Sequence, residues 1–348
     1  MIIPILLLAV GFVLLIKGGD WFVDGAAGIA RRFHLPEILI GATVVSIGTT
    51  LPEVMVSAGA AAQGSGSIAY GNAIGSIICN TSLIAALTIA IKPGKAARKS
   101  LILPVAFFFG AAAFYSLTAY ISGTFTRTTG IILLACFVVY MVTIVVRMKK
   151  TSATLDQVVA EETDENLVSE QQLEQASGED HVVESKKEGT KDSFIKDAFM
   201  LVLGAAVIAI GADLLVDNAI IIAEKLGISQ TVIGLTIVAL GTSLPELVTA
   251  ITSLVKGHGS LSLGNIIGAN LFNLVLVSGV AVTINPFDVP ASSFIAGINS
   301  SLIIDIPVML AVMLILTIPT IIKQKLSRWQ GFTMLAIYVS YLIAQFVI

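Results

Sequence analysis

Residues 41–53 read GATVVSIGTTLPE, and the chain repeats this stretch as GLTIVALGTSLPE at residues 234–246. Eight of the 13 aligned positions are identical. The same offset of 193 residues relates Asp20 to Asp213 and Asn80 to Asn273 without a gap. Because one register holds over this length, the sequence predicts two copies of a single structural unit.

The composition is that of a membrane protein. Of the 348 residues, 56% are hydrophobic and 12% are charged, whereas soluble domains carry about 25% charged residues. Of the 23 acidic residues, 12 lie between residues 156 and 192, so the rest of the chain is more apolar still. Cys79 and Cys136 lie in apolar runs, which argues against a disulfide framework. We expect the lipid bilayer, and no nucleic acid, as the partner of such a surface.

Ten apolar runs are long enough to cross a bilayer, which takes about 20 mostly apolar residues. The first begins at Met1 without a basic leader and is longer than the apolar part of a signal peptide, so we expect it to be retained. The sequence therefore predicts an all-α membrane protein with ten transmembrane helices. They span residues 2–30, 37–62, 67–91, 101–121, 129–147, 195–223, 230–255, 260–284, 293–319 and 329–348.

The Lys and Arg residues predict how the spans are oriented, since cytoplasmic loops are enriched in both. With the N-terminus outside, 17 of the 20 basic residues face the cytoplasm, Lys17 lies within the first span, and only Arg127 and Lys225 face outward. An even number of spans then places the C-terminus outside as well. The predicted location is the cell membrane, plasma or inner, with multiple crossings.

Residues 151–193 interrupt the apolar pattern. This segment is rich in Glu, Gln, Ser and Lys and has no aromatic residue, so it cannot bury enough apolar surface to fold alone. We interpret it as an acidic cytoplasmic linker between a first membrane unit at residues 1–150 and a second at 194–348. A regulatory cation-binding role stays open for its carboxylates, although the spacing of a tight Ca2+ loop is missing.

Each unit has five spans, an odd number, so the second unit enters the membrane from the opposite side. Inverted repeats are an architecture of secondary transporters, whose substrate site lies near the midplane between the repeats. The repeated motif falls near the middle of the second and seventh spans. There Gly48 with Pro52, and Gly241 with Pro245, are expected to break the helix and free backbone carbonyls. A cation would satisfy such carbonyls.

Glu53 and Glu246 directly follow these expected breaks. A carboxylate at the centre of a bilayer is costly, and no Lys or Arg of the nearby spans offers itself as a partner, so protons or metal ions must neutralise the pair. The surrounding donors are hard oxygens, which suit Ca2+ and alkali cations rather than Zn2+ or Cu+. They belong to Thr49, Thr50, Ser76, Asn80, Thr242, Ser243 and Asn273.

Other small and polar residues of the repeats have a structural interpretation. Small residues allow membrane helices to approach closely. We therefore expect helix packing from Gly71, Gly75, Gly264 and Gly268. Asn72 and Asn265 either pair helices or support the ligands. Asp20, Asp24, Asp213 and Asp217 are interpreted as gate or interface groups, and Asp305 in the ninth span has no assigned role.

The motifs GTTLPE and GTSLPE, followed by GNAIGSIICN and GNIIGANLFN, resemble the alpha-repeats of the cation/Ca2+ exchanger superfamily, in particular its prokaryotic Na+/Ca2+ exchanger branch. The resemblance covers both units. It implies that Glu53 and Glu246 are the central cation ligands and that the carbonyls of Thr49 and Thr242 join them for Ca2+. It also implies that Na+ shares the carboxylates and uses the side chains of Thr50, Ser76, Asn80 and Ser243.

Two positions depart from the family pattern. Ala269 stands where the family often has Ser, and Asn273 stands where K+-dependent members have Asp. The expected function is antiport of Ca2+ against Na+ by alternating access, with no enzymatic activity and no cofactor. An H+-coupled Ca2+ antiporter is the alternative. A passive channel conflicts with tight binding of a divalent ion, and an intramembrane hydrolase lacks an activating His, since all three His residues fall in connections.

Overall fold

The computed structural model describes residues 2–33, 35–147, 191–226, 241, 243–291, 294–295 and 297–347. Thr242 and residues 151–190 of the expected linker lie outside the described residues. Apart from four two-residue strands, the regular structure of the described part is helical. Strand β1 (Thr124–Phe125) pairs with β2 (Phe287–Asp288), and β3 (Phe294–Ile295) pairs with β4 (Ile298–Asn299).

Within the described residues, eight helices are long and apolar enough to cross a membrane, and each overlaps one of the predicted spans. The chain is therefore a multi-pass helical membrane protein. The spans are Ile2–Arg32 (α1), Glu37–Ala62, Gly66–Ile91, Arg98–Ser122 (α6), Arg127–Arg147, Phe194–Ile222, Gly259–Ile284 and Ser301–Lys323. The sixth belongs to α8 (Lys191–Lys225). At the seventh and tenth predicted spans lie α11 (Leu244–Val255) and α15 (Arg328–Val347).

Four of these spans contain one widened, π-helical turn, a feature that occurs frequently at functional sites. Two of the turns begin at the repeat-related residues Asn80 and Asn273. The second span consists of α2 (Glu37–Ile40), η1 (Gly41–Val45) and α3 (Ser46–Ala62). The third consists of α4 (Gly66–Cys79), η2 (Asn80–Ala85) and α5 (Ala86–Ile91). The eighth predicted span consists of α12 (Gly259–Phe272), η4 (Asn273–Val277) and α13 (Ser278–Ile284), and the ninth predicted span consists of η5 (Ser301–Asp305) and α14 (Ile306–Lys323).

The expected helix break at Gly48 and Pro52 is wrong, because α3 continues through Pro52. A proline removes one backbone donor, and the chain accommodates it without ending the helix. The widened turn η1 lies at the start of the repeated stretch instead, before Gly48, and there the Ser46 hydroxyl donates to the Gly41 carbonyl at 2.7 Å. In the second unit, α11 begins at Leu244 with its proline in the first turn, where a missing N–H costs nothing.

The expected start of the ninth span at residue 293 is also wrong. The β3–β4 hairpin precedes the helix, and Gly297 takes a positive φ of 81° in its turn. The Asn299 side chain then accepts a hydrogen bond from the Ser301 backbone N–H at 2.8 Å. A side-chain oxygen that satisfies an early N–H fixes the start of a helix, so the apolar run before Ser301 becomes a hairpin.

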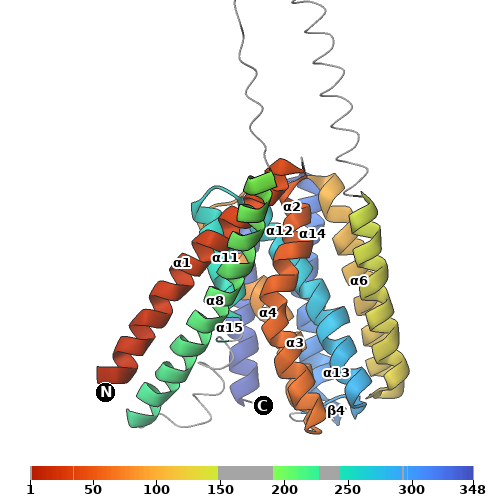
Figure 1. Cartoon of the computed structure of the whole chain (residues 1–348). Helices are drawn as coiled ribbons and strands as arrows, with labels where there is room; N and C mark the ends of the chain where they lie inside the picture. Colours follow the sequence, from red (N-terminus) through yellow and green to blue (C-terminus); the bar gives the residue numbers. More distant parts are fainter. Residues whose placement is uncertain are drawn as a thin grey trace, which may run out of the picture.

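Helices α1 and α8 lie side by side at one edge of the bundle (Figure 1). Their glycines bring the two backbones into contact, since a Cβ at Gly25 would lie 2.5 Å from the Asp197 carbonyl oxygen and one at Gly11 would lie 2.8 Å from the Gly211 carbonyl oxygen. Small residues give membrane helices this closeness. This helix pair, with one helix from each repeat, packs against the motif-bearing helices α3 and α11.

Among the eight described spans, Gly259–Ile284 is the most enclosed, with 83% of an 18-residue apolar stretch buried. The packing expected of its glycines is confirmed, because a Cβ at Gly264 would overlap the Ile38 carbonyl and one at Gly268 would overlap the Ser46 side chain. The same expectation is wrong for Gly71 and Gly75 on α4, where an added Cβ would meet no atom within 4 Å.

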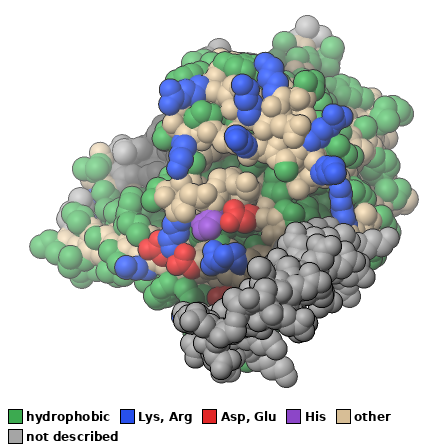
Figure 2. All heavy atoms as spheres, turned by 90° about the horizontal axis from the view of Figure 1, so that it is seen from above, with side chains coloured by type: hydrophobic (Ala, Val, Ile, Leu, Met, Phe, Trp, Pro, Cys, Tyr) green, Lys and Arg blue, Asp and Glu red, His purple; other side chains and the backbone are tan. Residues whose placement is uncertain are grey.

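The two ends of the bundle differ in charge. Both chain termini lie at one end, here called the terminal end (Figure 1). Lys and Arg side chains gather on the opposite face, here called the basic end, with a small acidic group and a His among them (Figure 2).

At the basic end, Lys256 joins α11 to α1, with its Nζ 2.7 Å from Asp24 Oδ1 and 3.2 Å from Asp20 Oδ1. Burial lowers the pKa of Lys256, but the hydrogen bonds to Asp24 and Asp20 outweigh this effect and leave the pKa of Lys256 above its usual value. The interface role expected of Asp20 and Asp24 is therefore confirmed. In the same region, His258 Nδ1 lies 2.6 Å from Glu37 Oε1.

Candidate cation site

Glu53 on α3 and Glu246 in the first turn of α11 have no exposed surface. Their four carboxylate oxygens find no hydrogen-bond partner among the described residues. The two groups lie close enough for the charge of Glu246 to act on Glu53. Buried charges without partners destabilise a fold strongly, so this pair requires protons or cations to neutralise it.

Neutral side chains with unpaired atoms accompany the carboxylates. Thr50, Asn80 and Asn273 have no exposed surface, and Ser243 is 2% exposed. The hydroxyls of Thr50 and Ser243 and both amide atoms of the two asparagines make no hydrogen bond within the described part of the chain. Buried polar atoms normally have partners. A concentration of unpaired oxygens beside two carboxylates points to a ligand that supplies the missing contacts.

The two units interleave at this place. Asn80 begins η2, which packs against α11, the helix of Glu246. Asn273 begins η4, which packs against α3, the helix of Glu53, and against α4. Each asparagine thus sits on a turn that contacts the glutamate helix of the other unit, and the unpaired oxygens come from both halves of the chain.

Two further asparagines fix the helix α3, which carries Glu53. Asn72 donates to the Glu53 carbonyl at 3.1 Å and to the Ser57 hydroxyl at 2.8 Å. Asn265 accepts from the Thr49 hydroxyl at 3.2 Å through its side chain, and its own carbonyl accepts from Ser46. Asn72 therefore holds α3 within the first unit, whereas Asn265 ties α3 to the second. Thr49 also lies close to Glu246.

Ser76 and Cys79 are buried in the same region of the bundle. Ser76 on α4 is 4% exposed, and Thr242 lies outside the described residues. Cys79, which precedes Asn80, is buried close to both glutamates and is a free thiol. In the described part of the chain, no three His, Cys, Asp or Glu side chains gather into a metal centre. The donors at the site are thus hard oxygens with a single thiol nearby.

Thr249 and Ser253 are two further polar residues that were not predicted from the sequence. They lie three and seven residues after Glu246, on the same face of α11, and both are fully buried with unpaired hydroxyls. The repeat comparison misses them, because the equivalent positions in the first unit are Val56 and Ala60. Helical spacing from Glu246 is the one sequence signal that could have found them.

Two hollows contain none of the predicted ligands. One of about 720 Å3 lies between α3 and α8 and is mostly apolar. Its lining includes Gly48, Pro52, Asp213 and Asp217. It therefore borders the outer side of the motif helix.

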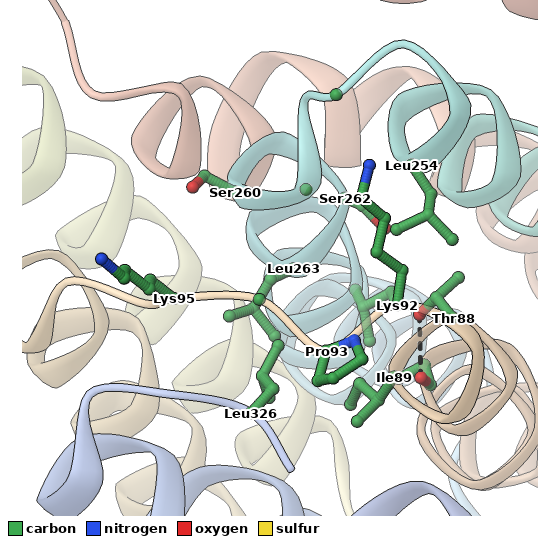
Figure 3. Close-up of a pocket in the computed structure, with 15 residues that line it drawn as sticks. Thr88, Ile89, Lys92, Pro93, Lys95, Leu254, Ser260, Ser262, Leu263 and Leu326 are labelled. Atoms are coloured by element: carbon green, nitrogen blue, oxygen red, sulfur yellow. Dashed lines mark hydrogen bonds between the residues drawn. The ribbon is translucent and has the colours of Figure 1, made fainter. Parts of the chain in front are cut away.

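The other hollow, of about 250 Å3, has Lys92 and Lys95 in its lining (Figure 3). Lys92 reaches across it toward Leu254 and Ser262, whereas Lys95 points to the other side. Thr88 at its edge is occupied by a hydrogen bond to the Ala85 carbonyl. The lysines give this hollow a positive charge, which does not suit a cation site.

Known proteins are similar to this chain over both units. The family described as sodium/calcium exchanger protein matches residues 3–146 and 196–347. The chain is 34% identical to the putative antiporter CaxA of Alkalimonas amylolytica over 347 residues, 98% of each protein. It is 32% identical to the sodium/calcium exchanger MaX1 of Methanosarcina acetivorans over 99% of this chain and 98% of that protein. The fold is similar to that of the sodium-calcium exchanger NCX_Mj, with a TM-score of 0.74, 29% identity and 98% of both chains covered.

Proposed function

The chain belongs to the sodium/calcium exchanger family and is a cation/Ca2+ antiporter, and from this premise we propose that it exchanges Ca2+ for Na+ by alternating access, with the ions bound between Glu53 and Glu246. The observation that supports this site most directly is the buried pair of carboxylates with four unpaired oxygens. A transporter of this family is a carrier, so Ca2+ and Na+ are its substrates and no cofactor is proposed.

Ca2+ takes six to eight oxygen ligands and carries the charge that two carboxylates neutralise. Bidentate binding by Glu53 and Glu246 would supply four oxygens, and the carbonyls of Thr49 and Thr242 would complete a set of six. The hydrogen bond from Thr49 to Asn265 supports a place for Thr49 in the site, because it holds this residue between the two units and close to Glu246.

Na+ would use the same carboxylates together with side-chain oxygens of Thr50, Ser76, Asn80, Ser243 and Asn273. The carrier without bound ions is high in free energy, since two charged carboxylates in a low-dielectric interior repel each other and lack solvation. At least two Na+ would neutralise them on the return step. The unpaired hydroxyls and amides support Na+ over protons, because a proton needs no such set of oxygens.

We further propose ten transmembrane helices arranged as two inverted five-helix repeats, residues 1–150 and 194–348, joined by a cytoplasmic linker at 151–193. Both termini would lie outside. The positive charge of the basic end supports this orientation, since cytoplasmic loops are rich in Lys and Arg (Figure 2). Eight of the ten helices have the length and composition of a span within the described residues.

The decisive test uses membrane vesicles loaded with Na+ and diluted into medium containing 45Ca2+. Uptake should follow the outward Na+ gradient with K+ absent and with a protonophore collapsing any pH gradient. Uptake that follows the pH gradient and ignores Na+ would replace this proposal with the H+-coupled alternative. Flux without a counter-ion would instead identify a channel.

A further inference from the structure

A third buried carboxylate, Asp305, lies outside the glutamate site. It is the last residue of η5 and is 9% exposed. No described Lys, Arg or His forms an ion pair with it. The corresponding span of the first unit, α6 (Arg98–Ser122), contains no Asp or Glu, so the first unit has no matching carboxylate. Asp305 is therefore a negative charge of the second unit that the exchange site does not use.

Neutral groups from three segments surround the Asp305 carboxylate. Tyr341 and Gln345 on α15 donate to its Oδ1 at 3.3 Å and 2.8 Å. The Ser301 hydroxyl, at the start of η5, lies close both to the carboxylate and to Tyr70 on α4. These contacts orient the carboxylate but carry no positive charge, so they leave its charge of −1 uncompensated.

Two tyrosine hydroxyls near Asp305 are buried without partners. Tyr70 is 4% exposed and Tyr115 is fully buried, and neither hydroxyl makes a hydrogen bond within the described residues. Both lie within electrostatic reach of Asp305. Their rings stack on Phe125, with centroids 6.5 Å and 4.4 Å away, so their positions are fixed by packing. Unpaired buried hydroxyls of this kind are unusual and point to a ligand beside the carboxylate.

We propose that Asp305, Ser301, Tyr70 and Tyr341 form a second cation site, which takes one monovalent alkali ion and is separate from Glu53 and Glu246. One carboxylate balances one positive charge, whereas Ca2+ would leave an excess charge in a low-dielectric surrounding. Hydroxyl and carboxylate oxygens are hard ligands, and hydroxyls rotate to present lone pairs to a cation.

The fold places this site near the terminal end. Helix α15 ends there, beside the marked C-terminus, and β4, which directly precedes η5, also lies there (Figure 1). The site goes beyond the proposed exchange reaction and does not depend on which ion drives it.

The test uses the purified full-length protein with both central carboxylates neutralised, Glu53→Gln with Glu246→Gln. Thermal unfolding is measured in NaCl and in N-methyl-D-glucamine chloride at equal ionic strength. A ligand that binds the folded state raises the Tm in a saturable way, so Na+ should raise the Tm of this double variant. Equilibrium binding of 22Na+ should give one site per chain.

Adding Asp305→Asn should abolish both the Na+-dependent rise in Tm and the bound 22Na+. The matched control is Asp288→Asn, which removes a carboxylate that is exposed and bonded to Thr124, and it should leave both unchanged. Should the Asp305 variant fail to fold, Tyr70→Phe removes one proposed ligand atom and should raise the half-saturating Na+ concentration several-fold.

Three results would overturn the site. The first is a Tm of the double variant that does not change with the Na+ concentration. The second is a Na+-dependent rise in Tm that persists after Asp305→Asn is added. The third is a Tm of the double variant that changes with pH but not with Na+. The last would mean that a proton neutralises Asp305. Loss of the exchange reaction in the vesicle assay bears on the glutamate site alone, so failure of the two proposals can be told apart.

Discussion

The Thr49 hydroxyl on α3 donates to the Asn265 side chain on α12 at 3.2 Å, so the second unit holds the first unit's GTTLPE motif in place. The repeat-related Asn72 instead contacts the Glu53 carbonyl and Ser57 within its own unit. Equivalent asparagines thus have different tasks. The bond across the units fixes Thr49, whose carbonyl, and not its hydroxyl, is the Ca2+ ligand that we propose.

Replacing Thr49→Val tests this division of roles. The change removes the donor to Asn265, whose amide nitrogen is already unpaired. Leaving a buried polar group unsatisfied costs about 1–3 kcal/mol, so the Tm should fall while Ca2+ exchange persists. Thr49→Ser keeps the hydroxyl and should behave like the wild type in both assays. Loss of exchange in a folded Thr49→Val protein would mean that the hydroxyl is itself a ligand.

Replacing Glu53→Gln or Glu246→Gln should have opposite effects on stability and transport. Either change removes half of the charge that faces Ca2+ and should weaken Ca2+ binding at least about tenfold, or 1.4 kcal/mol. It also relieves the repulsion between two buried carboxylates, so the ion-free protein should have a higher Tm. Both effects are measured on protein purified by one protocol, by 45Ca2+ uptake and by thermal unfolding.

The control for these variants is Glu37→Gln, which alters a carboxylate that contacts His258 at the basic end, away from the site. It should leave 45Ca2+ uptake close to that of the wild type. Near-normal exchange by either central variant would show that the ions bind elsewhere.

The tie between Lys256 and α1 predicts a response to alkaline pH. The pKa of Lys256 is raised by Asp24 and Asp20, so the contribution of this group to stability is full below the unfolded lysine pKa of about 10.4. It is lost as pH rises through the higher pKa of the folded state. Stability should therefore be insensitive to this group between pH 6 and pH 9.

Lys256→Gln should remove the alkaline loss and cost at most about 1 kcal/mol at neutral pH, since the partners are part-exposed. Thermal unfolding from pH 7 to pH 11 measures this. A variant that keeps the wild-type alkaline response would exclude Lys256 as its origin.

Much of this architecture could be predicted from the sequence, because apolar length and the 193-residue repeat are properties of the chain alone. The site residues could be placed on their helices for the same reason. Details that depend on neighbours could not be predicted. Gly264 packs against Ile38 whereas its equivalent Gly71 faces open space, although the two share one motif.

The surroundings of Asp305 could not be predicted for a similar reason. Its partners Tyr341 and Gln345 lie 36 and 40 residues further along the chain, and the fold alone brings them together. Likewise, whether Pro52 ends a helix depends on how its surroundings satisfy the freed carbonyl, which local sequence does not contain.

The acidic segment offers a test of topology. Cysteines introduced within residues 151–190 of a variant that lacks the two native cysteines should react with an impermeant thiol reagent only from the cytoplasmic side. Everted vesicles and intact cells separate the two sides. Reaction in intact cells would reverse the proposed orientation, and with it the side to which Asp305 is assigned.

Thr249 provides the sharpest contrast between stability and function. Its hydroxyl is fully buried on the Glu246 face of α11 without a partner, a state that costs about 1–3 kcal/mol. Thr249→Val removes the unpaired group and nearly keeps the shape, so it should raise the Tm. If this hydroxyl contacts Na+ or Ca2+ beside Glu246, the same change should also lower the rate of 45Ca2+ exchange.

The repeat supplies the matched control for Thr249→Val. Val56 is the equivalent residue of the first unit and is 43% exposed, so Val56→Thr adds a hydroxyl where it stays free of the site. That variant should leave both exchange and Tm close to the wild type. A Thr249→Val protein that is more stable and exchanges ions at the wild-type rate would contradict a contact with the ions. The unpaired hydroxyl would then contribute nothing to transport, and Glu246 would be the last residue of α11 that binds the ions.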